Sequence, residues 1–141
     1  MENNHQVKLS ILDFVHIFKD SKPTESLMNS TEMAQLADKL GYTRYWFTEH
    51  HNTTSQISTS PDLLSMHAAA HTKNIRVGSG GIMLPNHSPF KVVENFTLLE
   101  ALHPGRIDLG IGRASGTDGW TAWALQRSRE KLLPPMIFQN S

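Results

Sequence analysis

A strand followed by a helix recurs along this chain with a nearly fixed step, and this recurrence restricts the fold more than any other feature. The expected strand centres Trp46, Val77 and Leu109 lie 31 and 32 positions apart. Strands that alternate with helices indicate successive βαβ units and a parallel sheet, and their crossovers are nearly always right-handed. The expected fold class is therefore α/β, as either an open doubly wound sheet or part of a (β/α)8 barrel.

Hydrophobic periodicity and helix-breaking residues place the individual elements. Apolar and β-branched residues predict strands over 7–14, 42–48, 75–84 and 106–111. Apolar residues at helical spacing predict helices over 25–40, 60–72 and 88–102. Ser60-Pro61 and Ser88-Pro89 each predict a helix start, with a capping hydroxyl before a proline at the first helical position. The expected apolar face of the third helix consists of Val92, Val93, Phe96, Leu99 and Leu102.

The length of the chain limits how much of a barrel it can form. A complete barrel takes about 250 residues, whereas this chain has 141. We therefore expect half of a (β/α)8 TIM barrel, with about four parallel βα units, truncated before barrel closure. Residues 1–141 are expected to be a single domain fragment, with regular βα units over 7–113 and a less regular C-terminal segment over 114–141. Within that segment, spacing predicts a helix over 117–131.

Composition excludes several classes of protein. Lys and Arg number 13, as do Asp and Glu, so the balance of charge argues against nucleic acid or an acidic membrane surface as a partner. Cysteine is absent, which excludes disulfides, cysteine-ligated zinc, iron–sulfur clusters and thiol catalysis. Apolar runs fall short of the ~20 residues of a membrane helix, and residues 1–5 lack the features of a signal peptide. A cytoplasmic protein is expected.

Glu49-His50-His51 follows the second expected strand, at a carboxyl end where parallel α/β proteins bind ligands. Neighbouring strand residues point to opposite faces, so His50 and His51 are not expected to chelate one metal ion. One imidazole is expected to point into the mouth of the sheet, where it can act as an acid or base near neutral pH. The alternative is a pair of loop histidines held by hydrogen bonds.

Glycines interrupt the third expected strand at Gly78, Gly80 and Gly81. Glycine weakens strands and often marks a bulge or a place where a ligand approaches the backbone. Two interpretations are open: a planar ring lies on the bare backbone, or a helix packs closely against the strand.

A second glycine-rich segment runs from Gly110 to Gly116 and contains Arg113. Glycines and an arginine at a strand end suit one phosphate group. The segment is not the dinucleotide fingerprint, because Ser115 stands where the third glycine belongs. A solvated arginine is the alternative.

Two histidines, His67 and His71, have the i, i+4 spacing of a helical zinc pair. Ala68 stands where a metalloprotease carries its general-base glutamate, and no third ligand is evident in the sequence. They are interpreted as ordinary helix histidines, and no metal ligand is predicted.

Three ordered segments of the chain resemble the bacterial luciferase-like flavin-dependent monooxygenases. They are residues 41–52 (GYTRYWFTEHHN), 77–89 (VGSGGIMLPNHSP) and 102–113 (LHPGRIDLGIGR). The resemblance implies a (β/α)8 barrel that uses reduced FMN, or in some relatives deazaflavin F420, together with O2. It implies oxidation of a small organic substrate, and it covers only the N-terminal half of such a protein.

The resemblance also implies roles for individual residues. His50 corresponds to the active-site histidine beside the flavin. Ser79, Gly80 and Gly81 correspond to the strand that backs the flavin ring, and a bulge or a cis peptide bond is expected between Ser79 and Gly81. Arg113 corresponds to a basic residue near the flavin phosphate.

Two other interpretations are open. One, which follows from the short length, is a non-catalytic oligomeric remnant, or the partner subunit of a flavoprotein, that binds no flavin on its own. Another, which rests on the side-chain chemistry alone and not on the length, is a His-rich metal-binding α/β module. Four βα units cannot close a barrel, and unpaired edges and exposed apolar faces favour association. We therefore expect a homodimer or a larger assembly.

Overall fold

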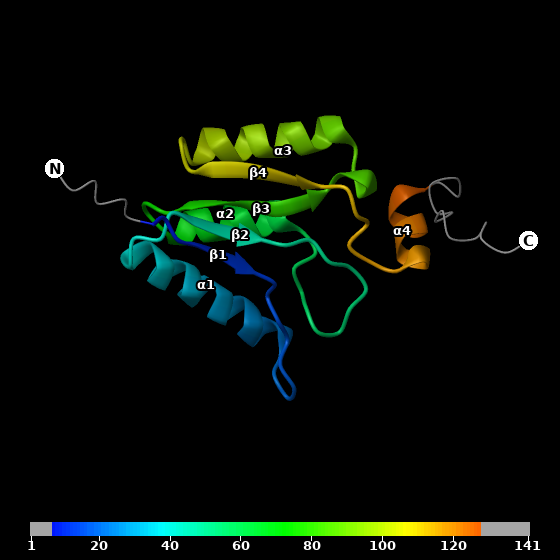
Figure 1. The fold of residues 1–141 in the computed structure, drawn as a ribbon, viewed down its shortest axis with the longest axis horizontal. Helices are drawn as coiled ribbons and strands as arrows, with labels where there is room; N and C mark the ends of the chain where they lie inside the picture. Colours follow the sequence, from blue (N-terminus) through cyan, green and yellow to red (C-terminus); the bar gives the residue numbers. More distant parts are fainter. Residues whose placement is uncertain (1–6, 128–141) are drawn as a thin grey trace, which may run out of the picture.

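The computed structural model describes residues 7–127. Its strands are β1 (Ser10–Asp13), β2 (Arg44–Phe47), β3 (Arg76–Met83) and β4 (Ile107–Gly112), all parallel and in the order β1-β2-β3-β4 (Figure 1). The helices are α1 (Pro23–Lys39), α2 (Pro61–His71), α3 (Pro89–Leu102) and α4 (Gly119–Gln126), and a short 3-10 helix, η1 (Leu84–Asn86), follows β3. The predicted α/β class with four parallel βα units is confirmed. Strands in simple sequential order, as here, are the arrangement found in a barrel rather than in a doubly wound sheet.

The predicted starts of α2 and α3 are confirmed, but neither Ser60 nor Ser88 makes the expected side-chain capping bond. Helices α2 and α3 begin with proline, whose fixed φ suits the first helical turn. The hydroxyls of Ser60 and Ser88 accept no capping bond. Only their backbone carbonyls join the helices, by accepting from the N–H groups of Leu64 and Val92, each at 3.1 Å. Within residues 7–127, no helix has both the length and the apolar character needed to cross a bilayer.

Strand β1 and helix α4 differ most from their predicted boundaries. Strand β1 begins at Ser10 rather than at residue 7, and Val7 and Leu9 are exposed. In the described part of the chain β1 is an edge strand that pairs only with β2, so its first residues have backbone hydrogen-bond partners on one side only. In place of the helix predicted over 117–131 the structure has the shorter α4. Asp118 caps its start by accepting two backbone N–H bonds, and the left-handed backbone of Arg127, with φ 54°, ends it. Residues 128–131 lie outside the described residues.

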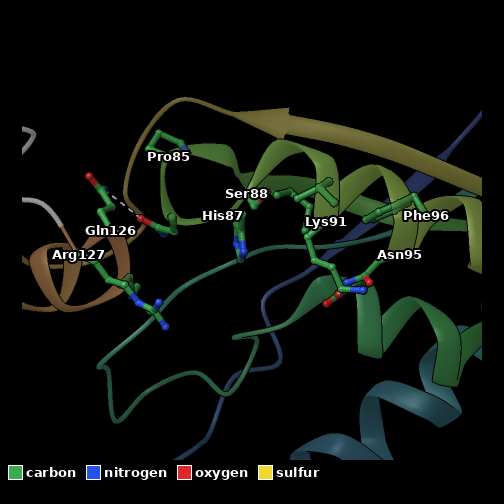
Figure 2. A pocket seen from close by; sticks show the side chains of 13 residues that line it. Pro85, His87, Ser88, Lys91, Asn95, Phe96, Gln126 and Arg127 are labelled. Carbon is green, nitrogen blue, oxygen red and sulfur yellow. Dashed lines mark hydrogen bonds between the residues drawn. The ribbon is translucent and has the colours of Figure 1, made fainter.

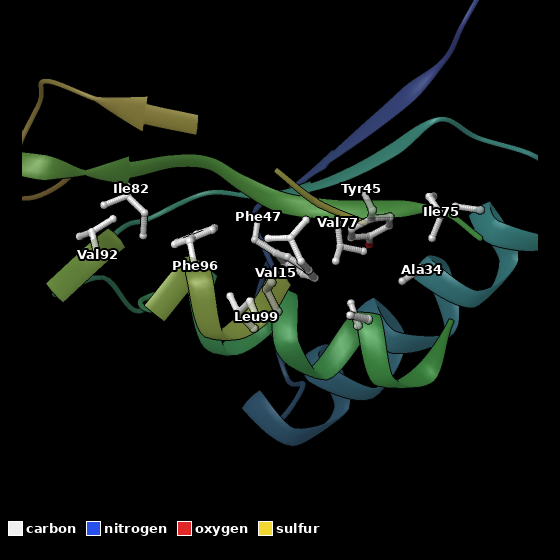
Figure 3. Close-up of a cluster of buried hydrophobic side chains, with 14 residues drawn as sticks. Val15, Ala34, Tyr45, Phe47, Ile75, Val77, Ile82, Val92, Phe96 and Leu99 are labelled. Carbon is white, nitrogen blue, oxygen red and sulfur yellow. The ribbon is translucent and has the colours of Figure 1, made fainter. Parts of the chain in front are cut away.

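The hydrophobic core lies between one face of the sheet and helices α1, α2 and α3 (Figure 3). From α3 it receives Val92, Phe96 and Leu99, which share one helical stripe. The prediction for this helix was wrong for Val93 and Leu102, because both lie beside that stripe and are 56% and 52% exposed. The complete buried cluster is Val15, Ala34, Ala37, Tyr45, Phe47, Ala68, Ala69, Ile75, Val77, Ile82, Val92, Phe96, Leu99 and Ile107.

The other face of the sheet is open within the described residues. Leu12, next to Trp46 in the register, is 49% exposed. On the helix-side face, at the β4 edge, Leu109 and Ile111 are 38% and 56% exposed. These apolar side chains are the surfaces that the rest of a barrel would be expected to cover.

A charged cluster ties three strands together near their amino ends. Asp108 on β4 accepts from Arg44 Nε at 3.0 Å and from Arg76 Nη2 at 2.6 Å. The Arg76 guanidinium, with Arg44 beside it, holds the pKa of the Asp108 carboxyl below its ordinary value. The cluster therefore secures the end of the sheet that is remote from the predicted site.

Replacing Asp108 with Asn is expected to lower the free energy of unfolding at neutral pH by about 1–3 kcal/mol, because charge-assisted bonds to both arginines are lost. The pKa of Asp108 is lower in the folded state, so this stabilisation is present above the unfolded pKa near ~3.9 and is lost as pH falls through the folded pKa. Urea denaturation across acidic pH should therefore show a shallower pH dependence for Asp108→Asn. Glu94→Gln, which breaks only an exposed pair with Lys91, should change stability by less than about 0.5 kcal/mol; equal losses would contradict the assignment.

Candidate active site at the carboxyl ends of the strands

Glu49, just beyond β2, is a fully buried acidic side chain at this end of the sheet. Its carboxylate has no exposed surface, and Oε1 accepts from His51 Nε2 at 2.8 Å and from His87 Nε2 at 2.7 Å. Oε2 accepts the backbone N–H of Met83 at 2.7 Å. A buried carboxylate needs such donors to offset its lost hydration. Glu49 therefore joins the end of β2 to the end of β3.

His50 has a different environment from His51, as predicted for neighbouring residues. Its Nδ1 lies 3.2 Å from Thr48 Oγ1, and its ring stacks on Phe14 with centroids 5.7 Å apart. Its backbone N–H donates to Ser58 at 2.8 Å. His50 remains partly exposed, whereas His51 is fixed by Glu49. With Nδ1 beside Thr48, Nε2 is the ring nitrogen that remains for a ligand.

The glycine segment of β3 breaks the regular ladder, as expected. The Gly80–Gly81 peptide bond is cis, and the register with β4 shifts between Ser79 and Ile82. Gly80 is exposed, and a Cβ built on it would lie 3.0 Å from the Trp46 Cβ. Gly80 therefore presents bare backbone on the open face of the sheet.

Its neighbours Gly81 and Ser79 are buried. A Cβ on Gly81 would lie 2.9 Å from the Gly110 carbonyl oxygen, so close strand packing requires glycine there. The Ser79 hydroxyl donates to the Gly110 carbonyl at 2.9 Å and accepts the Gly110 N–H at 3.1 Å. The close contact that requires glycine at Gly81 is with strand β4 and not with a helix, so the helix-packing interpretation is wrong at this position. Gly80 leaves an open surface, and a ring lying on it stays a prediction.

The loop after β4 folds back onto the loop after β2. The Gly116 carbonyl accepts from the His51 N–H at 3.1 Å, and Thr117 Oγ1 donates to the His51 carbonyl at 2.9 Å. Gly116 has φ +66°, and a Cβ there would lie 2.6 Å from the Glu49 carbonyl oxygen. Arg113 is exposed at the start of this loop. The structure thus brings the loops after β2 and β4 together and leaves the Arg113 side chain at the surface.

The histidine pair of α2 lies away from these strand ends. His67 Nε2 is 3.0 Å from Thr31 Oγ1 on α1, and His71 Nδ1 is 2.7 Å from the His67 carbonyl. Burial, together with the neighbouring His71, lowers the pKa of His67. No group of three or more His, Asp or Glu side chains among residues 7–127 is arranged to hold a metal ion.

Sequence reasoning missed two members of the site. His87 and Asn86 both reach the Glu49 carboxylate, and Asn86 also donates to the Ser115 carbonyl at 2.7 Å. Their position between the glycine-rich strand and the Ser88-Pro89 helix start was a usable signal, because such a connection lies at a carboxyl end. The sequence alone did not show that Glu49 would be their common partner.

Comparison with known proteins agrees with this geometry. The model of the luciferase-like monooxygenase family matches residues 7–123. The chain is 47% identical over 121 residues to a luciferase-like monooxygenase of Escherichia coli (strain K12), covering 86% of this chain and 36% of that protein. The crystal structure of apo-MsnO8 has a TM-score of 0.84 and 44% identity, covering 90% of this chain and 39% of that one.

A more distant structure shows the same fold. It is the oxygenating constituent of 3,6-diketocamphane monooxygenase from Pseudomonas putida in complex with FMN, with a TM-score of 0.70 and 24% identity, covering 76% of this chain and 30% of that one. The chain spans between 36% and 39% of the length of four curated relatives. Since the family model covers most of its residues and a protein of that description shares nearly half of the aligned positions, the chain belongs to the luciferase-like monooxygenase family.

Proposed function

We propose that this chain contributes the first four βα units of a flavin-dependent monooxygenase, which uses reduced flavin and O2 to oxidise a small organic substrate. Family membership supports the reaction class. The observation that carries the proposal is the exposed backbone of Gly80, on the same edge of the sheet as His50.

The residues present fit a flat aromatic cofactor. Gly80 has no side chain, and Leu12 and Trp46 lie beside it on the open face, both within 3.1 Å of where a Cβ on Gly80 would stand. A planar ring could therefore lie directly on the backbone, with apolar side chains along its edge. Reduced flavin, when bound, supplies the electrons for activation of O2. FMN is the proposed flavin, as in the Pseudomonas neighbour, and F420 is the alternative because it offers a similar flat ring.

The side chains of the chain have distinct proposed roles. His50 is the proposed catalytic residue, holding or donating a proton through Nε2 while Thr48 and Phe14 orient its ring. Ser79 and Gly81 shape the strand beneath the ring by their close contacts with β4. Arg113 is the proposed partner of the flavin phosphate, since an exposed guanidinium at a strand end suits an oxyanion.

We also propose that the chain works as a homodimer or larger assembly in the cytoplasm. Leu109 and Ile111 on the β4 edge and Leu12 on the open face are exposed apolar side chains. Burial of such surface favours association. A second copy could cover it edge to edge, or two copies could join through their helices.

Binding of FMN tests the proposed platform. The chain is expected to bind FMN, and Gly80→Ala should weaken binding at least about tenfold, or ~1.4 kcal/mol, because its methyl group would separate the ring from the backbone. Fluorescence quenching of FMN measures the affinity. Gly119→Ala is the control for the addition of a methyl group, since nothing lies within 4 Å of a Cβ built there. A Cβ on Gly80 would lie 3.0 Å from the Trp46 Cβ, so thermal unfolding of Gly80→Ala must match the wild type for its effect to be assigned to the ring. No binding by the wild-type chain, or equal effects of both changes, would overturn the platform.

Reoxidation of reduced FMN tests the role of His50. The quantity measured is the rate of O2 consumption with the protein present minus the rate with free reduced FMN alone. This difference should fall about 10²-fold in His50→Ala, the usual scale for an acid or base group. His67→Ala, on α2, should leave this rate unchanged. An oxygen electrode measures both rates, and equally small effects would show that His50 is not catalytic.

Light scattering at micromolar concentration tests assembly. We expect a dimer or larger species that buries more than ~1,000 Å2. Ile111→Lys should dissociate an assembly that forms through the β4 edge, whereas Leu63→Lys, at an exposed position on α2, should dissociate one that forms through helices. A monodisperse wild-type monomer would refute this proposal.

A further inference from the structure

A cavity of about 470 Å3 lies outside the proposed flavin platform. Residues at the start of α2, in η1, on α3 and at the end of α4 line it, and it is open to solvent (Figure 2). This volume falls within the ~300–1,000 Å3 typical of small-molecule pockets. Ile82 and Phe96 in its wall belong to the helix-side core, so the cavity lies on the opposite face of the sheet from exposed Gly80.

Two cationic side chains line this cavity from different helices. Arg127 extends from the end of α4 and Lys91 from α3 (Figure 2). Lys91 Nζ lies 3.2 Å from Glu94, in a pair whose two side chains are 67% and 50% exposed, and such pairs contribute little and open readily. Lys91 is therefore available to a ligand, and the Arg127 side chain is exposed.

The carboxylate in the lining is already occupied. Asp62 accepts from Asn95 Nδ2 at 2.8 Å and from the Leu63 N–H at 3.0 Å. The positive ends of these N–H dipoles partly offset the field of its charge, which reduces its repulsion of an anion. The lining residues Asp62, Lys91 and Arg127 together carry one net positive charge.

His87 adds a rigid polar group between the two cations (Figure 2). Its Nε2 is held at 2.7 Å by Glu49, which has no exposed surface, while its own side chain is 34% exposed. A buried carboxylate behind an imidazole fixes the orientation of the ring. No step of the proposed monooxygenase reaction uses this exposed edge of His87.

We propose that this cavity binds a small organic anion. Val92 and Phe96 form an apolar wall for the body of the ligand, and Arg127 and Lys91 hold its carboxylate or other oxyanion group. Apolar walls with a few convergent polar groups are the usual composition of ligand pockets. The site is separate from flavin binding and lies beyond the proposed function.

Titration of the 15N-labelled chain with benzoate tests the site. Saturable shifts of the Lys91 and Asn95 amide signals are expected. Benzyl alcohol, which has the same ring without the charge, should bind at least about tenfold more weakly, because it lacks the charge-assisted bonds. Inorganic phosphate, which has the charge without the apolar body, should also bind more weakly. Equal affinity for benzoate and either probe would overturn the proposal.

Variants separate this site from general charge effects. Arg127→Gln should weaken benzoate binding at least about tenfold, while Lys19→Gln, which removes the same charge from an exposed loop, should leave it unchanged. Equal effects of both substitutions would show nonspecific attraction and overturn the site. FMN should not displace benzoate; displacement would assign the cavity to the flavin and overturn the claim of a separate site.

Discussion

The buried carboxylate of Glu49 is the constraint on which the functional end of this molecule depends. A charge without solvent contact is stable only when donors surround it, and those donors come from the loop after β2, the end of β3 and the connection to α3. One side chain therefore sets the relative position of three segments. His50 precedes the braced His51 directly, so its backbone is fixed by the same arrangement.

The two faces of the sheet have different tasks. Helices α1, α2 and α3 cover one face with small and aliphatic side chains and with the aromatic ring of Phe96, which stabilises the fold by burying apolar surface. The other face carries Leu12, Trp46 and the bare backbone of Gly80. Between these faces, β3 and β4 approach each other closely at Gly81 and Gly110. A Cβ at either position would overlap the backbone of the neighbouring strand, so only glycine fits there.

The sequence was sufficient for the order of the elements, because the strand–helix period and the Pro61 and Pro89 helix starts are local signals. Glycines within a strand also marked β3 as irregular. The resemblance to the luciferase-like family placed a bulge or a cis peptide bond between Ser79 and Gly81, and the Gly80–Gly81 bond is cis. It did not identify His87 as a partner of Glu49, because that contact joins residues 38 positions apart. The end of α4 depends on the left-handed backbone of Arg127, which no residue preference indicated.

The contact of Gly116 with the end of β2 has an evolutionary consequence. Any other residue would face two penalties together, a disfavoured backbone angle and an overlap with the Glu49 carbonyl oxygen. Substitutions at this position would therefore be removed by selection even if the loop itself contacted no ligand. Substitutions that adapt such a protein to new chemistry would accumulate at more tolerant surface positions. The contact between the loops after β2 and β4 at Gly116 would stay unchanged.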